Sequence, residues 1–255
     1  MIKNIAVIGE SCVDEYVYGT CDRVCPEAAA LCFKHDSIKT INMGMAGNTF
    51  NNIKTLNKES NIDLITTQSQ IIKRRFVDKR YNAIIFREDI NDTCDRISLK
   101  DYDFSKYDCI VFSDYCKGFL HDEDIIDICT LKNNKCITFM DTKKKLNQFV
   151  QYIDFIKINS KEFATNILDF TMINSLCSLI VTTGENGANF YPKGNPVFTN
   201  YPTKKIELRD VCGAGDTFLA ALVTEYMKSF DIVKSILYAN DCSSKVVSQF
   251  GVVTP

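Results

Sequence analysis

The chain has 255 residues, the length of one large α/β domain, and 45% of them are hydrophobic, which is enough for a sizeable core. Charged residues make up 24% and the formal net charge is −2, so the composition gives no reason to expect a nucleic-acid or membrane partner. The amino terminus has no charged region followed by an apolar one, and no apolar run approaches transmembrane length. We therefore expect a cytoplasmic protein.

Most of the chain alternates short apolar runs with helically spaced ones. The pattern predicts strands at 5–8, 109–112, 136–140, 154–158 and 179–182, and a hairpin at 189–197. Between and after them it predicts helices at 46–56, 123–131, from about 161, 214–228 and 232–248. This alternation predicts a mostly parallel sheet covered on both faces. In such folds ligands bind beyond the carboxyl ends of the strands. The polar residues expected there are Glu10, Asp14, Asp114, Asp141, Asn159 and Thr183.

Two segments, near residues 14–36 and 70–90, do not fit this alternation. Within the second, residues 71–77 and 83–87 are typical of the two arms of a hairpin around a polar turn. We expect both segments to form a small β lid over the ligand site, within a single domain that spans residues 1–255. An isolated small sheet leaves an apolar face to cover, so we expect a homodimer through the lid.

Twelve cysteines are spread along the chain, and no two of them form a C-x-x-C pair. One cluster, Cys21, Cys25, Cys32 and His35, has the residue types of a zinc site, but its spacing matches no standard finger. We expect the cysteines to be reduced thiols, and metal binding by this cluster stays an open alternative.

The most informative stretch runs from Asp210 to Phe218. Gly213, Ala214 and Gly215 directly precede Asp216, and a strongly helical run follows. Small residues bring backbone N–H groups close to a ligand, and the start of a helix favours an anion. Asp216 places a carboxylate at that anion site. Together they suit phosphoryl transfer to a hydroxyl, because one steadies the phosphate and the other accepts the proton.

Other phosphate-binding motifs do not occur. The chain has no G-x-x-x-x-G-K-[ST] sequence and no protein-kinase catalytic set. The run from Gly213 to Phe218 lacks the third glycine of a dinucleotide fingerprint and lies near the carboxyl terminus. A dehydrogenase is therefore not expected.

Residues 210–218 resemble the carboxyl-terminal signature of the ribokinase-like (PfkB) sugar kinases, and Asn159-Ser160-Lys161-Glu162 resembles their Asn-x-x-Glu motif. Four further segments resemble the D-glycero-β-D-manno-heptose-7-phosphate kinase branch: residues 14–19, 23–28, 44–48 and 113–118. The resemblance implies a three-layer αβα core with a small β lid. It also implies ATP- and Mg²⁺-dependent phosphorylation, in the heptose branch on the anomeric hydroxyl of a heptose 7-phosphate.

The same resemblance implies roles for individual residues. It makes Asp216 the general base and the amides of Gly213, Ala214 and Gly215 an anion hole. The residues implied to bind the nucleotide are Asn159, Glu162, Lys143, Thr183, Gly184 and Gly187, with Glu162 also organising Mg²⁺ indirectly. The residues implied to bind the sugar or its phosphate are Asp14, Gly44, Asn48, Lys73, Arg75 and Asp114.

The chain departs from this family at several positions. Met45 replaces a glycine, Glu15 replaces an arginine beside the expected sugar site, and Asp141-Thr142-Lys143 replaces Asp-Pro-Lys. After Leu56 roughly twenty to thirty residues are missing, about one βα unit. Because of these changes, two alternative functions stay open. One is another PfkB sugar or nucleoside kinase, for example for fructose or ribose. The other is a degenerate, non-catalytic protein that binds a sugar or nucleotide.

Simpler interpretations remain for some of these residues. Asn159 and Glu162 have the pattern of a helix-capping box. Lys73 and Arg75 suit exposed lid charges, Asp14 suits a turn, and Asp114 suits a surface turn.

Overall fold

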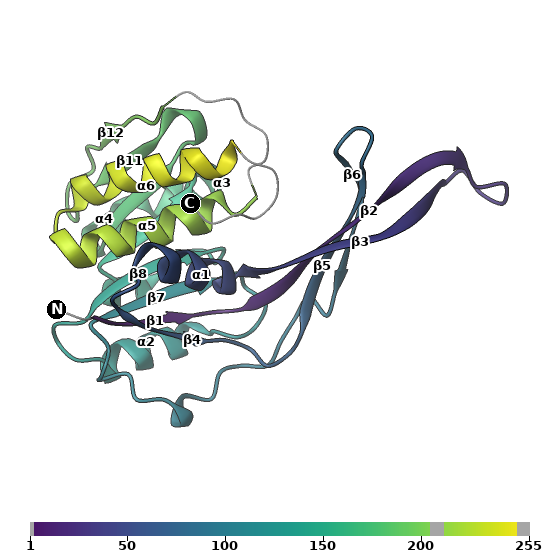
Figure 1. The fold of residues 1–255 in the computed structure, drawn as a ribbon. Coiled ribbons are helices and arrows are strands. Elements are labelled where there is room, and N and C mark those ends of the chain that lie inside the picture. The colour runs from purple at the N-terminus through teal and green to yellow at the C-terminus, as the bar shows by residue number, and fades with distance from the viewer. Residues whose placement is uncertain (1–2, 205–211, 249–255) are drawn as a thin grey trace.

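The computed structural model describes residues 3–204 and 212–248, which form a layered core and a long projecting arm (Figure 1). The core sheet has eight strands in the order β12-β11-β10-β9-β8-β7-β1-β4. Their bounds are β1 (Asn4–Ile8), β4 (Asn61–Ile65), β7 (Cys109–Asp114), β8 (Ile137–Thr142), β9 (Phe155–Asn159), β10 (Ser178–Thr182), β11 (Ala188–Tyr191) and β12 (Thr199–Tyr201). All neighbours from β4 to β10 are parallel, and β11 and β12 are antiparallel additions.

Helices cover both faces of this sheet, because alternate strand residues point to opposite sides. On one face, Ile5 and Val7 pack with α1 (Ala46–Leu56), α5 (Ala214–Ser229) and α6 (Ile232–Val247). On the other, Ala6 and Ile8 belong to the cluster under α2 (Asp122–Leu131), α4 (Phe170–Leu176) and the 3₁₀ turn η2 (Gln148–Tyr152). The short α3 (Ser160–Thr165) follows β9 directly, and short 3₁₀ turns lie at Leu99–Asp101 and Ile167–Asp169. The predicted parallel sheet and three-layer core are confirmed.

The arm is a separate four-stranded sheet in the order β3-β2-β5-β6. It consists of β2 (Ser11–Val24), β3 (Leu31–Met45), β5 (Ile71–Asp78) and β6 (Ala83–Ile90). Strand β2 pairs antiparallel with β3 and parallel with β5. Since β2 follows β1 closely and β3 runs directly into α1, this sheet (the lid) is joined to the core beside the carboxyl ends of the core strands.

The structure differs from the sequence expectations at three elements. Strand β4 was not expected, and β3 continues to Met45 rather than ending near residue 36. The second arm of the predicted 189–197 hairpin lies later, at Thr199–Tyr201. Each error concerns a partly exposed edge or lid segment, where a hydrophobic pattern is weakest.

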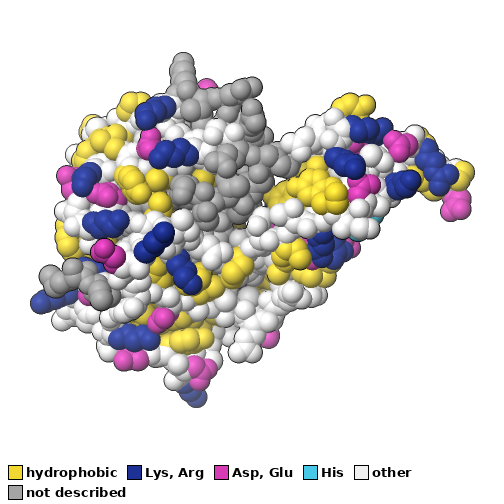
Figure 2. All heavy atoms as spheres, viewed as in Figure 1, with side chains coloured by type: hydrophobic (Ala, Val, Ile, Leu, Met, Phe, Trp, Pro, Cys, Tyr) yellow, Lys and Arg dark blue, Asp and Glu magenta, His cyan; other side chains and the backbone are white. Residues whose placement is uncertain are grey.

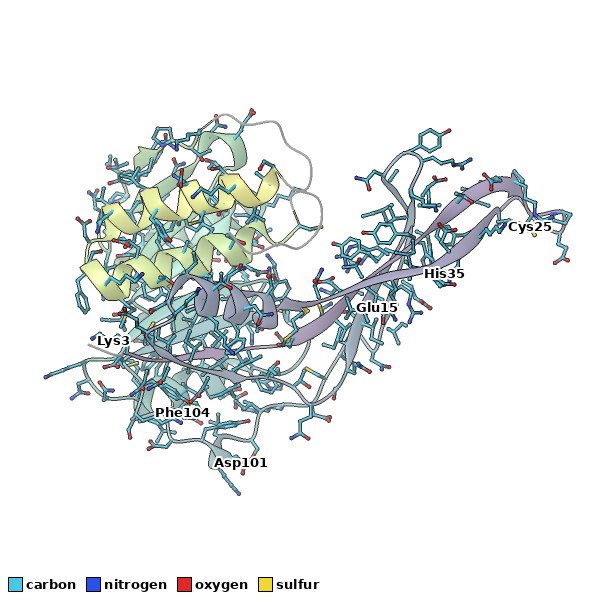
Figure 3. All side chains as sticks on the ribbon, viewed as in Figure 1. Lys3, Glu15, Cys25, His35, Asp101 and Phe104 are labelled. Atoms are coloured by element: carbon cyan, nitrogen blue, oxygen red, sulfur yellow. The ribbon has the colours of Figure 1, made fainter. Side chains whose placement is uncertain are left out.

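The candidate zinc ligands are distributed along the lid. Figure 3 shows Cys25 at its far tip and His35 part of the way back. Within residues 3–204 and 212–248, no group of three or more His, Cys, Asp or Glu side chains is arranged to hold a metal ion. In that same part of the chain no helix is long and apolar enough to cross a membrane.

Candidate active site

Helix α5 begins within the stretch that the sequence singles out. Gly213 precedes the helix with a φ of 76°, which glycine adopts without strain, and its carbonyl accepts a hydrogen bond from Thr217 N at 2.9 Å. The N–H groups of the first turn and the helix dipole favour an anion here. Asp216 lies in this turn and is only 5% exposed. Asp210 and Val211, which open the signature, lie outside the described residues.

The two carboxylate oxygens of Asp216 accept hydrogen bonds from different elements. The Tyr115 hydroxyl, just after β7, donates to Oδ1 at 2.6 Å, and Asn48 Nδ2, in α1, donates to Oδ2 at 2.9 Å. Burial raises the pKa of Asp216 to about 6, while the bonds from Tyr115 and Asn48 act to lower it. A carboxylate with this pKa suits a general base that works near neutral pH.

A buried ion pair lies beneath the start of α5. Lys157 Nζ, on β9, donates to Asp141 Oδ2, on β8, at 2.6 Å, and both side chains are buried. A Cβ atom on Gly215 would lie 3.0 Å from this ammonium, so only glycine fits there without moving Lys157. The positive end of this ion pair therefore lies closer to the helix terminus than its negative end, which favours an anion there.

A cavity of about 410 Å³ opens on one side of this helix terminus. Its lining includes Gly184 and Gly187 from the turn after β10, Ala214 and Gly215 from α5, and Asn240 from α6. The cavity thus lies between the predicted anion hole and the predicted nucleotide turn.

Thr183 is not among the residues that line this cavity. Its hydroxyl donates to Gly187 O at 3.0 Å and closes the turn after β10. The geometry favours a role in shaping this turn over the direct nucleotide contact that the sequence predicted.

Asn159 and Glu162 form the capping box of α3. Asn159 Oδ1 accepts hydrogen bonds from the N–H groups of Lys161 and Glu162, and Glu162 Oε2 accepts one from Asn159 N at 2.8 Å. Glu162 Oε1 pairs with Lys143, which also lies over the Tyr115 ring. The capping box thus holds Glu162 Oε2 against Asn159 N, and Glu162 Oε1 faces Lys143, on the side of Tyr115.

Most of the residues predicted to bind sugar gather where the lid meets the core. Arg75, on β5, donates to Asp14 Oδ1, on β2, and both are buried. Gly44 adjoins them, since a Cβ there would lie 2.0 Å from Asp14 Oδ2. Lys73 Nζ lies 5.3 Å from the centre of the Tyr115 ring. Lid and core are therefore linked through Tyr115.

Two departures from the family have different surroundings from those expected. Glu15 was expected beside the substrate, but successive strand residues point to opposite faces, and Glu15 lies on the face away from Asp14. There it pairs with Lys39 and Arg74. Met45 is buried at a φ of 59° and packs in a small apolar cluster beside Tyr115. The charge reversal at Glu15 therefore does not reach the site.

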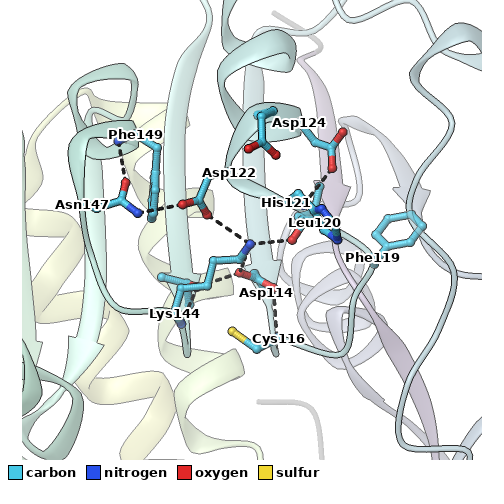
Figure 4. Close-up of polar contacts among 12 residues, drawn as sticks. Asp114, Cys116, Phe119, Leu120, His121, Asp122, Asp124, Lys144, Asn147 and Phe149 are labelled. Atoms are coloured by element: carbon cyan, nitrogen blue, oxygen red, sulfur yellow. Dashed lines mark hydrogen bonds and ion pairs between the residues drawn. The ribbon is translucent and has the colours of Figure 1, made fainter.

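Asp114 lies below the site rather than in it. It is buried, and it accepts hydrogen bonds from Cys116 N at 3.0 Å and from Thr142 Oγ1 at 2.8 Å. Lys144 lies between Asp114 and Asp122 (Figure 4). This geometry favours a scaffolding role for Asp114 over the sugar contact that the sequence predicted.

Two residues of the site were not singled out by the sequence analysis. Tyr115 was only part of a family-like run, and nothing in the sequence showed that its hydroxyl would reach Asp216. Lys157 did carry a signal, because a lysine inside an otherwise apolar strand must be paired when it is buried.

Comparison with known proteins identifies relatives of the whole chain. A family model described as "pfkB family carbohydrate kinase" matches residues 28–255. The "Bifunctional protein HldE" of a Nitratiruptor species is 27% identical over 302 residues, covering 100% of this chain and 63% of that protein. The protein of the same name from Aliarcobacter butzleri is 27% identical over 301 residues, covering 98% of this chain and 62% of the relative. The chain thus spans less than two thirds of the length of these relatives.

Solved structures share the fold. Ribokinase from Thermotoga maritima has a TM-score of 0.75 at 15% identity and covers 98% of this chain and 95% of its own. Arabidopsis thaliana ribokinase complexed with ribose and ATP has a TM-score of 0.73 at 12% identity, with coverage of 98% and 94%. At these identities the likeness establishes the architecture and not the substrate.

Proposed function

The chain belongs to the pfkB family of carbohydrate kinases, and on this premise we propose that it transfers the γ-phosphoryl group of ATP to a hydroxyl of a sugar phosphate. The observation that carries the proposal is the position of Asp216. This buried carboxylate stands at the amino end of α5, between the 410 Å³ cavity and the basic side chains of the lid.

In the proposed reaction Asp216 accepts the proton of the acceptor hydroxyl. The hydroxyl oxygen bonds to the γ-phosphorus, and the bond from phosphorus to the ADP oxygen breaks. The N–H groups of Gly213, Ala214 and Gly215 stabilise the charge on the transferred group, and Lys157 adds positive charge beneath them. These groups are held before the substrate arrives, so little reorganisation is needed during the reaction.

The nucleotide would occupy the cavity beside α5. Its adenosine end fits between the turn at Gly184 and Gly187 and helix α6, with its phosphates toward Gly215. Glu162 would act on Mg²⁺ through water, because its two oxygens are already engaged by Asn159 N and by Lys143. The metal would neutralise phosphate charge during transfer.

The lid supplies the features that suit a phosphorylated sugar. Asn48 offers hydrogen-bonding groups beside Asp216, Asp14 offers a carboxylate on the lid, and Gly44 leaves space for Asp14. Arg75 is already paired with Asp14, whereas Lys73 forms no ion pair among the described residues. Lys73 is therefore the cation we assign to the substrate phosphate, with Arg75 keeping Asp14 in place.

We favour the anomeric hydroxyl of a heptose 7-phosphate as acceptor. Support comes from the segments at 14–19, 44–48 and 113–118, which resemble the heptose branch. The test is ADP formation over a panel that includes heptose 7-phosphate, hexose phosphates, fructose and ribose, with ³¹P NMR of the product. We expect turnover with the heptose phosphate and a new anomeric phosphate signal. Turnover on fructose or ribose alone would contradict this choice of substrate.

We also propose that the protein is a homodimer paired through its lids. Ile41, Met43 and Phe86 are exposed on the lid face opposite Asp14. Figure 2 shows hydrophobic side chains gathered on the arm. Exposed apolar side chains on a thin sheet are unfavourable in water, and a second copy would cover them.

We propose a cytoplasmic location, because the reaction needs ATP and the cysteines form no disulfides among the described residues.

A further inference from the structure

We propose that Tyr115 is a positioning residue that holds the carboxylate of Asp216 in the orientation and ionised form needed to accept a proton. This inference rests on the proposed kinase function and deepens it. Its basis is the 2.6 Å hydrogen bond from the Tyr115 hydroxyl to Asp216 Oδ1. Asn48 holds the other oxygen, so the plane of the carboxylate is fixed at both ends.

The backbone of Tyr115 is fixed by a buried glutamate at the end of β1. Glu10 is fully buried, and its Oε2 accepts the N–H of Tyr115 at 2.8 Å. Its Oε1 accepts the N–H groups of Lys117 at 2.8 Å and Phe119 at 3.2 Å. One carboxylate thus binds three amides of the same loop. Charge-assisted bonds of this kind are stronger than neutral ones, so the loop is held firmly.

The next residue is held in an unusual conformation. Cys116 has a φ of 57°, which is unfavourable for a residue with a side chain, and its N–H is bound by Asp114 Oδ1 at 3.0 Å. Figure 4 shows Asp114 in turn beside Lys144, which also binds Leu120 O and Asp122. Strained backbone persists only where surrounding contacts impose it. Here those contacts direct the loop at Tyr115 toward α5.

Two lysines also flank the half-buried ring of Tyr115. Lys73 from the lid and Lys143 from the core lie 5.3 and 5.6 Å from its centre. Burial and the negative charge of Asp216 hold the pKa of Tyr115 well above its usual value. The phenol therefore stays protonated at all working pH values and acts as a donor to Asp216, not as a base.

The sign of the effect follows from the groups around Asp216. Burial and Asp141 favour its neutral form, while Tyr115, Asn48 and Lys157 favour the carboxylate. Among the described residues, Cys12 and Lys143 also interact electrostatically with Asp216. Removing the phenol hydroxyl leaves all of these in place and removes one stabilising bond. The Asp216 carboxylate should then take up its proton at higher pH.

The experiment compares Tyr115→Phe with Tyr107→Phe. Tyr107 is a matched control, because its hydroxyl donates to Asp63 at 2.7 Å and it precedes β7, whereas Tyr115 follows that strand. The Asp216 carboxyl is titrated by ¹³C NMR in the free protein and assigned by its loss in Asp216→Asn. The pH profile of kcat/KM is measured for the same proteins. Thermal unfolding confirms that both variants are folded.

Tyr115→Phe should raise the Asp216 midpoint and the acidic limb of kcat/KM together, by about one pH unit, as expected for one charge-assisted hydrogen bond. Tyr107→Phe should move neither. A folded Tyr115→Phe protein with an unchanged Asp216 midpoint would overturn the inference, whether or not turnover falls. Absence of turnover in the wild type would instead reject the kinase function, and the NMR midpoint would still decide the role of Tyr115.

Discussion

Gly44 shows how a single residue fixes the geometry of the proposed sugar site. The backbone of β3 passes so close to Asp14 that a Cβ atom at Gly44 would lie 2.0 Å from Asp14 Oδ2 and 2.6 Å from Cys12 Sγ. Both neighbours are buried and Asp14 is tied to Arg75, so neither can move freely. The space beside Gly44 is therefore required by Asp14.

Gly44→Ala should raise the KM for the sugar phosphate by about tenfold or more, because it displaces Asp14 and disturbs a charge-assisted hydrogen bond. The KM for ATP should change little, since the nucleotide cavity is lined by other elements. Gly194→Ala is the control for backbone strain without a clash, because Gly194 has a φ of 74° and a Cβ there meets no atom within 4 Å. Steady-state kinetics with each substrate varied would measure both effects. A sugar KM that is equal in the two variants would contradict this role for Gly44.

Sequence patterns predicted some site residues and not others for a physical reason. Asp216 follows its glycines directly, so local sequence was enough to suggest its chemistry. The contact between Tyr115 and Asp216 spans 101 residues and depends on the positive φ of Cys116. Cysteine seldom adopts that conformation, so no sequence pattern indicated it. Glu15 was misjudged because the face it occupies depends on strand register.

At the scale of elements, α3 combines a structural and a chemical role. Its capping box needs Asn159 Oδ1 and a side-chain acceptor at Glu162, while the ion pair with Lys143 needs the negative charge of Glu162. The two roles separate in substitutions, because a glutamine keeps the acceptor and loses the charge.

Glu162→Gln should lower kcat by at least tenfold while leaving thermal stability nearly unchanged, because the cap survives and the charge that we propose organises Mg²⁺ is lost. Asn159→Ala should instead cost about 1 kcal/mol of unfolding free energy through loss of the cap. Kinetics at several Mg²⁺ concentrations and chemical denaturation of both variants distinguish the roles. If Glu162→Gln turns over like the wild type, the glutamate serves the helix alone.

The core elements were predictable because their strands are buried on both faces and appear as unbroken apolar runs. The errors fell on β4, β12 and the part of β3 after residue 36, which have partly exposed residues. Such strands are defined by the neighbours that they pair with. Long-range pairing of this kind leaves little trace in local composition.

At the scale of the whole molecule, the lid has one face toward the site and an opposite face that carries both exposed apolar side chains and the ion pairs of Glu15. Phe86 is 60% exposed on that outer face. Phe86→Lys should shift the protein from a dimer toward a monomer of 28.9 kDa, measured by light scattering during gel filtration. Leu168→Lys is the control, since Leu168 is 96% exposed on the core. A wild type that is monomeric at high concentration would contradict the lid dimer.

The central claim is that Asp216 is the base of a sugar-phosphate kinase. The most direct test compares ADP formation by wild type and Asp216→Asn with saturating heptose 7-phosphate, at a pH well above the Asp216 pKa of about 6. Calorimetry measures sugar-phosphate binding in parallel. Asp216→Asn should lower turnover by about 10²- to 10⁴-fold while sugar-phosphate affinity is largely kept. Equal turnover by the two proteins would show that Asp216 is not the base.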